Sequence, residues 1–216
     1  MIRILIVDDS QTVRELLKAI LESDPEIQVV ATADSGEHAL EILHRVKPDI
    51  ITMDLHMPGM SGLLVTEKIM AQKPVPIVIV TADRDSALQG FKLLEAGALS
   101  VLETPSAPGQ AGYFESAEKL VKTVKSLNGV KLITRRSYPA VDKRSSCPKV
   151  EPSLSRRIIL IGASTGGPQA LKKIVDALEP SFPFAIVVTQ HIASGFLKGF
   201  VAWLNESNTV KAKVAE

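Results

Sequence analysis

The sequence predicts an α/β protein whose N-terminal part is a five-stranded, doubly wound parallel sheet. Two observations carry this prediction. Short apolar runs alternate with stretches of helical periodicity five times between residues 2 and 127. The alternation then stops in a basic segment and resumes at residue 158 for a shorter, second α/β unit. Strands that alternate with helices at this spacing form parallel sheets covered on both faces.

The first unit is built from five strand and helix pairs. The apolar runs predict strands over residues 2–7, 27–32, 49–54, 75–82 and 98–103. Apolar side chains three and four positions apart predict helices between and after them, over residues 13–21, 36–46, 62–71, 86–96 and 114–127. We therefore place the first domain at residues 1–127, which is long enough for a core of its own.

Residues 128–156 differ in composition and are predicted to be a linker. Counted to Arg157, the segment holds eight Lys or Arg residues against two acids, together with Pro139, Pro148 and Pro152. A solvated linker and a basic docking segment for an acidic partner are both compatible with this composition.

Residues 157–216 are predicted to be the front part of a larger, Rossmann-like α/β domain. Strands are expected over residues 158–164 and 184–191, and a third over residues 209–216. Two helices are expected, with inward faces made by Leu171, Ile174, Val175 and Leu178 and by Phe196, Phe200, Val201 and Leu204. So few strands leave much of the sheet uncovered, so we expect an exposed apolar edge and poor folding of this part in isolation.

Composition limits the classes of function. The net charge is +1, which argues against general binding of nucleic acid or of a membrane surface. The single cysteine, Cys147, excludes an intrachain disulfide and fits a reducing compartment. No stretch approaches the roughly 18–20 apolar residues that span a bilayer, and the N-terminus does not read as a signal peptide. A cytoplasmic protein without direct membrane insertion is therefore expected.

Four polar side chains follow or end the predicted strands of the first domain. Asp8 and Asp9 follow the first strand, Asp54 ends the third and Thr81 ends the fourth. Parallel strands bring these groups to one edge of the sheet, where three carboxylates repel one another unless a cation joins them. Few hard oxygen ligands suit Mg²⁺, and a carboxylate beside the cation can accept a phosphoryl group. Isolated, exposed strand-end acids are the simpler alternative.

The stretches IVDDS, MDLHMPGMSG and VTA resemble the receiver domains of response regulators over residues 1–127. The resemblance implies a flavodoxin-like fold and phosphorylation of Asp54 by a histidine kinase. It implies that Asp8, Asp9 and Asp54 hold Mg²⁺ with the backbone carbonyl of His56, and that Thr81 contacts the phosphoryl group.

One position departs from the receiver pattern. Where these domains carry Lys-Pro after the fifth strand, this sequence has Thr104 and Pro105. A threonine hydroxyl donates a hydrogen bond but supplies no charge. We therefore expect Asp54 to be phosphorylated but to switch the domain weakly.

The second unit contains Gly162-Ala163-Ser164-Thr165-Gly166, a G-x-S-x-G pattern between a strand and a helix. That context is the one required for a serine nucleophile on a tight turn. The two glycines are expected to relieve crowding there, and N–H groups at the helix start can stabilise an oxyanion. His191 ends the next strand, so both residues reach the same sheet edge. A phosphate- or dinucleotide-binding turn and a structural histidine are the alternatives.

The stretches IGASTGGPQAL and VVTQHIASGF resemble the catalytic domain of chemotaxis protein-glutamate methylesterases of the CheB family. The order of receiver, basic linker and this domain is also that family's layout. The resemblance implies hydrolysis of glutamate methyl esters on chemoreceptors and, in many members, deamidation of glutamines. It implies Ser164 as nucleophile, His191 as base, the Thr165 region as oxyanion support, and a receiver that partly covers the site.

The family's triad has a third member, an aspartate downstream of the histidine, and we expect that position to lie beyond Glu216. Glu206 is not assigned this role. Two further readings therefore stand beside the enzyme. The chain could be a receiver with an inactive esterase stub that serves as a phosphate sink or docking module. A receiver-type transcription factor is disfavoured because no helix-turn-helix pattern follows the linker.

Overall fold

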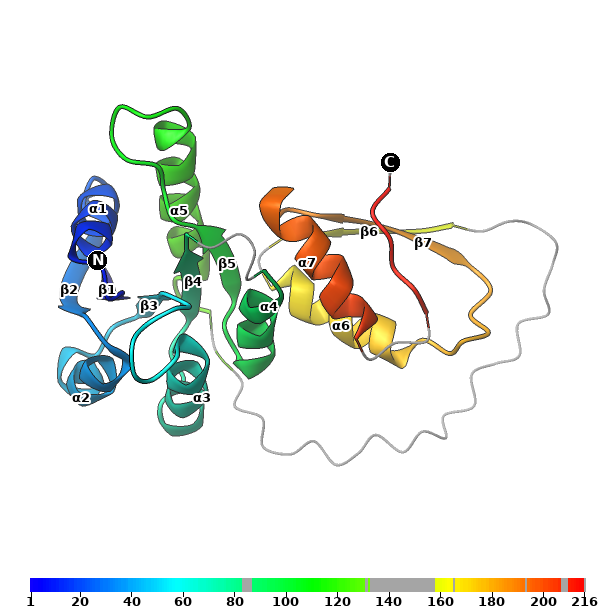
Figure 1. The fold of residues 1–216 in the computed structure, drawn as a ribbon, viewed down its shortest axis with the longest axis horizontal. Coiled ribbons are helices and arrows are strands. Elements are labelled where there is room, and N and C mark those ends of the chain that lie inside the picture. Colours follow the sequence, from blue (N-terminus) through cyan, green and yellow to red (C-terminus); the bar gives the residue numbers. More distant parts are fainter. Residues whose placement is uncertain are drawn as a thin grey trace.

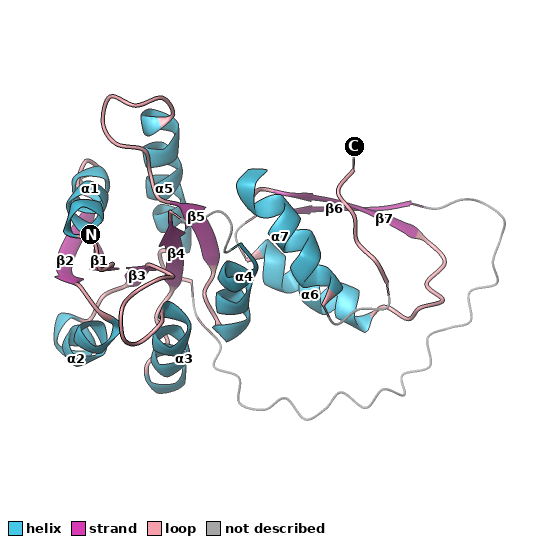
Figure 2. Cartoon of the chain, viewed as in Figure 1, coloured by secondary structure: helices cyan, strands magenta, loops and turns pink. Residues whose placement is uncertain are grey.

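The N-terminal unit is a five-stranded parallel sheet in the order β2-β1-β3-β4-β5 (Figures 1 and 2). The computed structural model describes residues 1–82, 87–130, 132, 158–164, 166–192, 194–206 and 210–215. The strands, close to the predicted ranges, are β1 (Ile2–Val7), β2 (Ile27–Ala33), β3 (Ile50–Met53), β4 (Ile77–Thr81) and β5 (Ser100–Glu103).

Helices cover both faces of this sheet, which confirms the doubly wound prediction. Alternate residues of β1 face opposite sides: Ile4 and Ile6 pack with the first group of helices, and Leu5 and Val7 with the second. The first group is α1 (Gln11–Leu21) and α5 (Tyr113–Leu127); the second is α2 (Gly36–Val46), α3 (Gly62–Gln72) and α4 (Ala87–Ala96). The start predicted for the fourth helix, Ser86, lies outside the described residues.

Three serines begin the helices that follow the first three strands. The hydroxyls of Ser10, Ser35 and Ser61 accept hydrogen bonds from backbone N–H groups in the first turns of α1, α2 and α3. These caps satisfy N–H groups that a helix leaves without partners. They also fix short strand-to-helix connections, so the residues after β1 and β3 are held at the carboxyl edge of the sheet.

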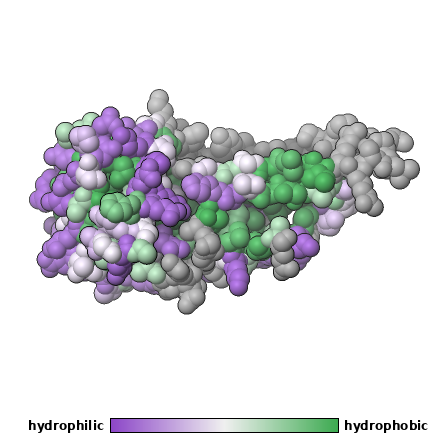
Figure 3. Space-filling model, turned by 90° about the horizontal axis from the view of Figure 1, so that it is seen from above, coloured by the Kyte–Doolittle hydropathy of each residue, from purple (hydrophilic) through white to green (hydrophobic). Residues whose placement is uncertain are grey.

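The C-terminal unit is a two-stranded parallel sheet with helices on one face. It consists of β6 (Ile158–Ala163), α6 (Gly167–Ala177), β7 (Ala185–Gln190) and α7 (Ser194–Asn205). Ile161 and Ala163 pack toward the core, whereas Leu160 is 76% exposed and Val187 49%. Figure 3 shows the resulting apolar surface over this part of the molecule. The exposed sheet agrees with the expectation that these residues do not cover their own strands.

The predicted third strand of this unit is wrong over residues 210–215, which form no strand. Backbone groups that a strand would use are bonded to a side chain instead. The N–H of Ala212 donates to Asn205 Oδ1 at 2.8 Å, and Asn205 Nδ2 donates to the Ala212 carbonyl at 3.0 Å. Asn205 ends α7, so this amide holds the last described residues against the helix.

Helix α4 of the first unit packs against α6 and α7 of the second (Figure 1). The contact is built on three aromatic side chains, Phe91 of α4 with Phe200 and Trp203 of α7. Trp203, absent from the predicted inward face, is fully buried. Leu171 is buried as predicted, but Ile174, predicted to face inward with it, is 40% exposed, and α6 buries Pro168 and Lys172 instead.

Candidate functional site

The acidic residues lie at the carboxyl edge of the five-stranded sheet, as predicted. Asp8 follows β1 and Asp54 follows β3, and these strands are neighbours in the sheet. The Asp54 N–H donates to the Val7 carbonyl at 2.8 Å, which extends the pairing of the two strands by one step. Asp8 is 4% exposed, Asp54 is half-buried and Asp9 is exposed. The fold therefore places two desolvated carboxylates beside a third, solvated one.

Burial and mutual repulsion control the protonation of this pocket. The pKa of Asp8 is raised to about 6, chiefly by burial and also by the negative charges of Asp54 and Asp9, while a hydrogen bond from the Ser10 N–H and the charge of Arg14 oppose the shift. Burial also raises the pKa of Asp54, aided by the charge of Asp9, while the N–H groups of Leu55 and His56 oppose the shift. The pocket thus carries negative charge that the surrounding protein does not fully neutralise.

The charge makes the pocket suited to a hard cation. Within the described ranges, no group of three His, Cys, Asp or Glu side chains is arranged as a complete metal cage. Mg²⁺ usually keeps several of its waters and takes only one or two protein carboxylates. Asp8, which is buried, and Asp54, which is half-buried, repel each other and fit that pattern.

Thr81 and Thr104 lie at the same edge on the next two strands. Thr81 ends β4 and is buried, and its carbonyl accepts a hydrogen bond from the Thr104 N–H at 2.9 Å. Thr104 directly follows β5. His56 is exposed, and its N–H donates to Asp54 Oδ2 at 3.1 Å. Thr81 and Thr104 therefore lie at the same sheet edge as Asp54, and their roles there stay predictions.

Asp8→Asn is expected to stabilise the Mg²⁺-free protein above pH 6. The folded-state pKa of Asp8, about 6, lies above its ordinary value of 3.8, so the stability cost of ionising Asp8 builds up as the pH rises between these two values and is complete above pH 6. A difference of about two pKa units corresponds to about 3 kcal/mol, an upper figure for the gain. Urea unfolding in EDTA at pH values from 4 to 8 measures it.

As the pH falls from 6 to 4, Asp8 becomes protonated in the folded parent protein, which regains stability. The difference in free energy of unfolding between Asp8→Asn and the parent should therefore shrink over this range. A stability difference that stays constant across this range would show that the charge of Asp8 is not its cause. Asp49→Asn, at an exposed carboxylate that accepts the Arg3 N–H just before β3, is the control for the amide substitution itself.

Ser164 and His191 directly follow the paired ends of β6 and β7. Ala163 and Gln190 are partners in the strand register, and the His191 N–H donates to the Ala163 carbonyl at 3.0 Å. The next residues along the two strands, Ser164 and His191, therefore emerge side by side. The predicted pairing of these strands is confirmed.

Backbone geometry at the turn after β6 explains two of its three glycines. Gly166 has φ of 73°, in the left-handed region that favours glycine. A Cβ on Gly167 would lie 2.2 Å from Gln190 Oε1 and 2.8 Å from Ala163 Cβ. Gly162 was expected to relieve crowding, but a Cβ there meets nothing within 4 Å in the described part of the chain. Thus Gly167, rather than Gly162, is the close-packed position.

The candidate nucleophile and the candidate base line one cavity without a hydrogen bond between their side chains. In the described part of the structure no hydrogen bond joins Ser164 Oγ to the His191 ring, although both line the same cavity. Catalytic hydrogen bonds are often loose before substrate binds. Thr165, the predicted oxyanion position, lies outside the described residues. Gly167, at the start of α6, donates its N–H to the Ser164 carbonyl at 2.8 Å.

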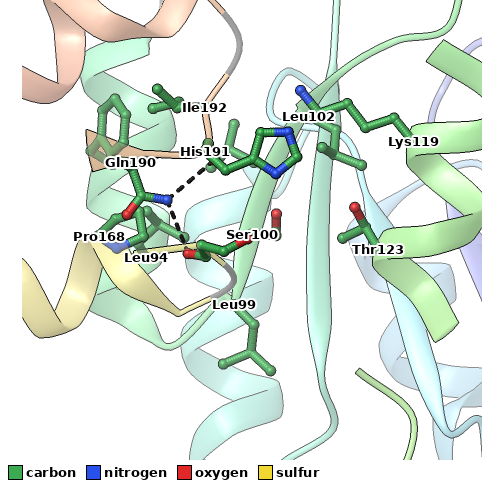
Figure 4. A pocket seen from close by; sticks show the side chains of 13 residues that line it. Leu94, Leu99, Ser100, Leu102, Lys119, Thr123, Pro168, Gln190, His191 and Ile192 are labelled. Atoms are coloured by element: carbon green, nitrogen blue, oxygen red, sulfur yellow. Dashed lines mark hydrogen bonds between the residues drawn. The ribbon is translucent and has the colours of Figure 1, made fainter. Parts of the chain in front are cut away.

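The receiver unit forms the other wall of this cavity (Figure 4). The volume of this cavity is about 40 Å³, enough for a few water molecules. Ser100 lies on β5, and Lys119 and Thr123 on α5; their side chains line the wall across from His191. The Gly166 N–H also donates to the Leu99 carbonyl at 3.3 Å. In this arrangement the first unit faces Ser164 and His191 across the cavity, and both residues remain solvent-exposed.

Sequence reasoning did not single out two glutamines that the structure places around the site. Gln190 Nε2 donates to main-chain carbonyls of both Ser164 and His191. Gln169 Nε2 donates to the carbonyls of Leu94 and Ala98 at the end of α4, at 2.5 and 2.6 Å. The only signal in the sequence was their position: Gln190 directly precedes His191, and Gln169 lies three residues after Gly166.

Comparison with known families finds a match for each of the two units. The model of the response regulator receiver domain matches residues 4–111, half of the chain. The chain belongs to the response regulator receiver family. The C-terminal unit of this response regulator matches a second model, that of the CheB methylesterase, over residues 159–216.

Relatives with both regions cover the whole response regulator. It is 41% identical, over 100% of its length, to a protein-glutamate methylesterase/protein-glutamine glutaminase of Geobacter metallireducens, and 42% identical to one of Nitrosospira multiformis. It spans 63% and 62% of the lengths of those two proteins. Among solved structures, the response regulator domain of Thermotoga maritima CheB is 30% identical, with a TM-score of 0.55, covering 61% of this chain and 99% of that one.

Proposed function

We propose that the chain is the regulatory and nucleophile-bearing part of a chemotaxis protein-glutamate methylesterase that also deamidates glutamines. The observation that carries the proposal is the emergence of Ser164 and His191 at adjacent register positions, in a cavity walled by a receiver. The names of the relatives support the substrate class.

In the proposed reaction Ser164 Oγ attacks the carbonyl carbon of a glutamate methyl ester, and the His191 imidazole accepts the hydroxyl proton. The Thr165 region would support the oxyanion. His191 then donates the proton to the departing methoxide, which leaves as methanol. Water, deprotonated by His191, hydrolyses the acyl-enzyme and frees Ser164. With a glutamine side chain, ammonia leaves instead.

Regulation is proposed to begin at Asp54, phosphorylated by a chemotaxis histidine kinase. Asp8, Asp9 and Asp54, with the His56 carbonyl, would hold Mg²⁺, which screens charge on the transferring oxygens. Thr81 would contact the phosphoryl group and Thr104 would take the place of the usual lysine, so the switch is expected to be weak.

The proposed switch moves the receiver wall away from Ser164. The phosphoacceptor edge and this wall share one set of elements, because β4, α4 and β5 connect Thr81 to the residues that line the cavity. A cavity of about 40 Å³ has no room for a receptor helix, since ligand pockets are typically about 300–1,000 Å³. Chemoreceptors, the proposed substrates, therefore require the two units to separate.

A cytoplasmic location is proposed with this function. No helix in the described residues has both the length and the apolar character needed to cross a membrane. No role for nucleic acid is proposed, since the net charge is +1.

Methanol release from methylated receptor membranes tests the proposal. The chain should release methanol faster with acetyl phosphate and Mg²⁺ than without them. Ser164→Ala should fall to the uncatalysed level, a loss of at least about 10³-fold, because the nucleophile is gone. Asp54→Asn should keep basal release and lose the stimulation. Equal release by Ser164→Ala would contradict the proposed nucleophile.

A second candidate function is a receiver that acts as a phosphate sink or docking module. The exposed strands β6 and β7 favour it, because that sheet is covered on one face only. Phosphate entering at Asp54 with no Ser164-dependent methanol release would support this candidate over the enzyme.

A further inference from the structure

A single side-chain amide joins the two chain segments that carry the serine and the histidine. Gln190 ends β7, and its Nε2 donates to the Ser164 carbonyl at 2.9 Å and to the His191 carbonyl at 3.2 Å (Figure 4). One donor group thus holds the residue after β6 and the residue after β7 together. The Ser164 carbonyl accepts a further hydrogen bond from the Gly167 N–H at 2.8 Å.

The orientation of this amide is determined by its partners. Two carbonyl oxygens can be satisfied only by the NH₂ group, because rotating the amide by half a turn would set Oε1 against both of them. In the observed orientation Oε1 is buried and has no hydrogen-bond partner among the described residues. The side chain keeps this unfavourable acceptor position while it makes two bonds to the main chain beside the catalytic candidates.

Gly167 supplies the space that the amide needs. A Cβ at that position would lie 2.2 Å from Gln190 Oε1, closer than real contacts allow. Glycine at the first position of α6 therefore lets the helix start approach the amide. The helix start, the turn with Ser164 and the end of β7 meet at this one side chain.

The amide is not what pairs the strands. The His191 N–H to Ala163 carbonyl bond, at 3.0 Å, continues the register of β6 and β7 without Gln190. Loss of the amide leaves that ladder in place but frees the turn beyond it. The effect falls on the approach of Ser164 to His191 rather than on formation of the sheet.

We propose that Gln190 is a positioning residue that fixes the main chain of Ser164 relative to that of His191 and so sets the distance for proton transfer between them. This inference rests on the proposed esterase function. A displacement of about 1 Å between reacting groups can cost about 100-fold in rate.

Two variants separate hydrogen bonding from packing. Gln190→Glu keeps the shape of the side chain but, when ionised, has no donor for either carbonyl. Gln190→Met keeps a similar volume without polar atoms. Gln72→Glu makes the same chemical change at an exposed residue that ends α3, and serves as the control.

In methanol-release assays with phosphodonor, both Gln190 variants should lower kcat about 10- to 100-fold and leave KM within about twofold, as expected for lost positioning. The ratio of Gln190→Glu activity to parent activity should rise as the pH falls, because the protonated carboxyl regains one donor. The same ratio for Gln190→Met should stay flat. An unchanged kcat in Gln190→Glu, or equal pH profiles for both variants, would overturn the proposal.

Amide NMR gives a readout that needs no enzymatic activity. Gln190→Glu should shift the amide resonances of Gly166 and Gly167 as well as that of Ile192, because the amide holds both segments; Gln72→Glu should move none of them. If the parent chain releases no methanol, the proposed function fails. The amide shifts still test whether Gln190 holds the Ser164 segment and the His191 segment together. Shifts confined to the end of β7 would show that Gln190 does not hold the Ser164 turn.

Discussion

Trp203→Ala is expected to lower the free energy of unfolding by about 3–5 kcal/mol and to detach α7 from the receiver unit. The Trp203 ring is fully buried and stacks on Phe91 of α4 with centroids 5.3 Å apart and planes inclined by 19°. Phe200 packs on both rings. Removing the indole leaves a cavity between α4 and α7, helices from the two units.

Polar contacts of the indole add to the loss. Trp203 Nε1 donates to Glu95 Oε1 at 2.9 Å, and Lys172 Nζ lies 5.9 Å from the ring centroid. Lys172 is 7% exposed and is paired with Asp176 at 2.6 Å. Without the ring this buried ammonium loses a cation–π contact, worth about 0.5–2 kcal/mol in proteins.

Urea unfolding and amide hydrogen exchange together measure the effect. Exchange should accelerate in α4 over residues 91–96 as well as in α7, because the cluster joins the two helices. Trp203→Phe, which keeps an aromatic ring but loses the bond to Glu95, should cost clearly less. If Trp203→Ala speeds exchange in α7 and leaves α4 unchanged, the cluster does not hold the units together. If the proposed function holds, Trp203→Ala should also raise methanol release in the absence of a phosphodonor, because the receiver wall is then held less firmly against the esterase unit.

Gly62→Ala is expected to destabilise the receiver by about 1–3 kcal/mol or more, although alanine favours helices. A Cβ on Gly62, the first residue of α3, would lie 2.4 Å from the Asp54 carbonyl oxygen and 3.4 Å from Leu55 Cα. The obstacle is backbone and has no rotamer to change. Either α3 or the segment after β3 must move, and the latter carries the phosphoacceptor candidate.

Urea unfolding measures the stability loss, and mass spectrometry after acetyl phosphate treatment should show slower phosphorylation of Asp54. Gly162→Ala is the matched control: its Cβ meets nothing within 4 Å among the described residues, and its φ is not positive. That variant should unfold within about 0.5 kcal/mol of the parent. Wild-type stability in Gly62→Ala would mean that the start of α3 moves away at little cost.

Periodicity predicted the order and type of the elements because it reports geometry within a few residues of each position. The polar residues at strand ends followed from the same logic. Once β1 and β3 are parallel neighbours, Asp8 and Asp54 must reach one edge of the sheet, and Ser164 and His191 likewise follow β6 and β7. Glycine function was harder to predict, since Gly162 and Gly167 look alike in sequence and only the position of Gln190 distinguishes them.

The sequence by itself thus determined the five-stranded receiver fold, the acidic edge and the serine turn, all of which depend on local pattern and on the rule that parallel strands end together. The sequence placed Phe196, Phe200 and Leu204 on the buried face of α7, but only the tertiary structure decided that Trp203 is buried with them. That helix is apolar around much of its surface, and the ring that stacks on Trp203, Phe91, lies 112 positions earlier in the chain. The tertiary structure also decided that residues 210–215 bond to Asn205 instead of extending the sheet. Contacts between distant segments depend on the shape and polarity of both surfaces, and local periodicity describes only one of them.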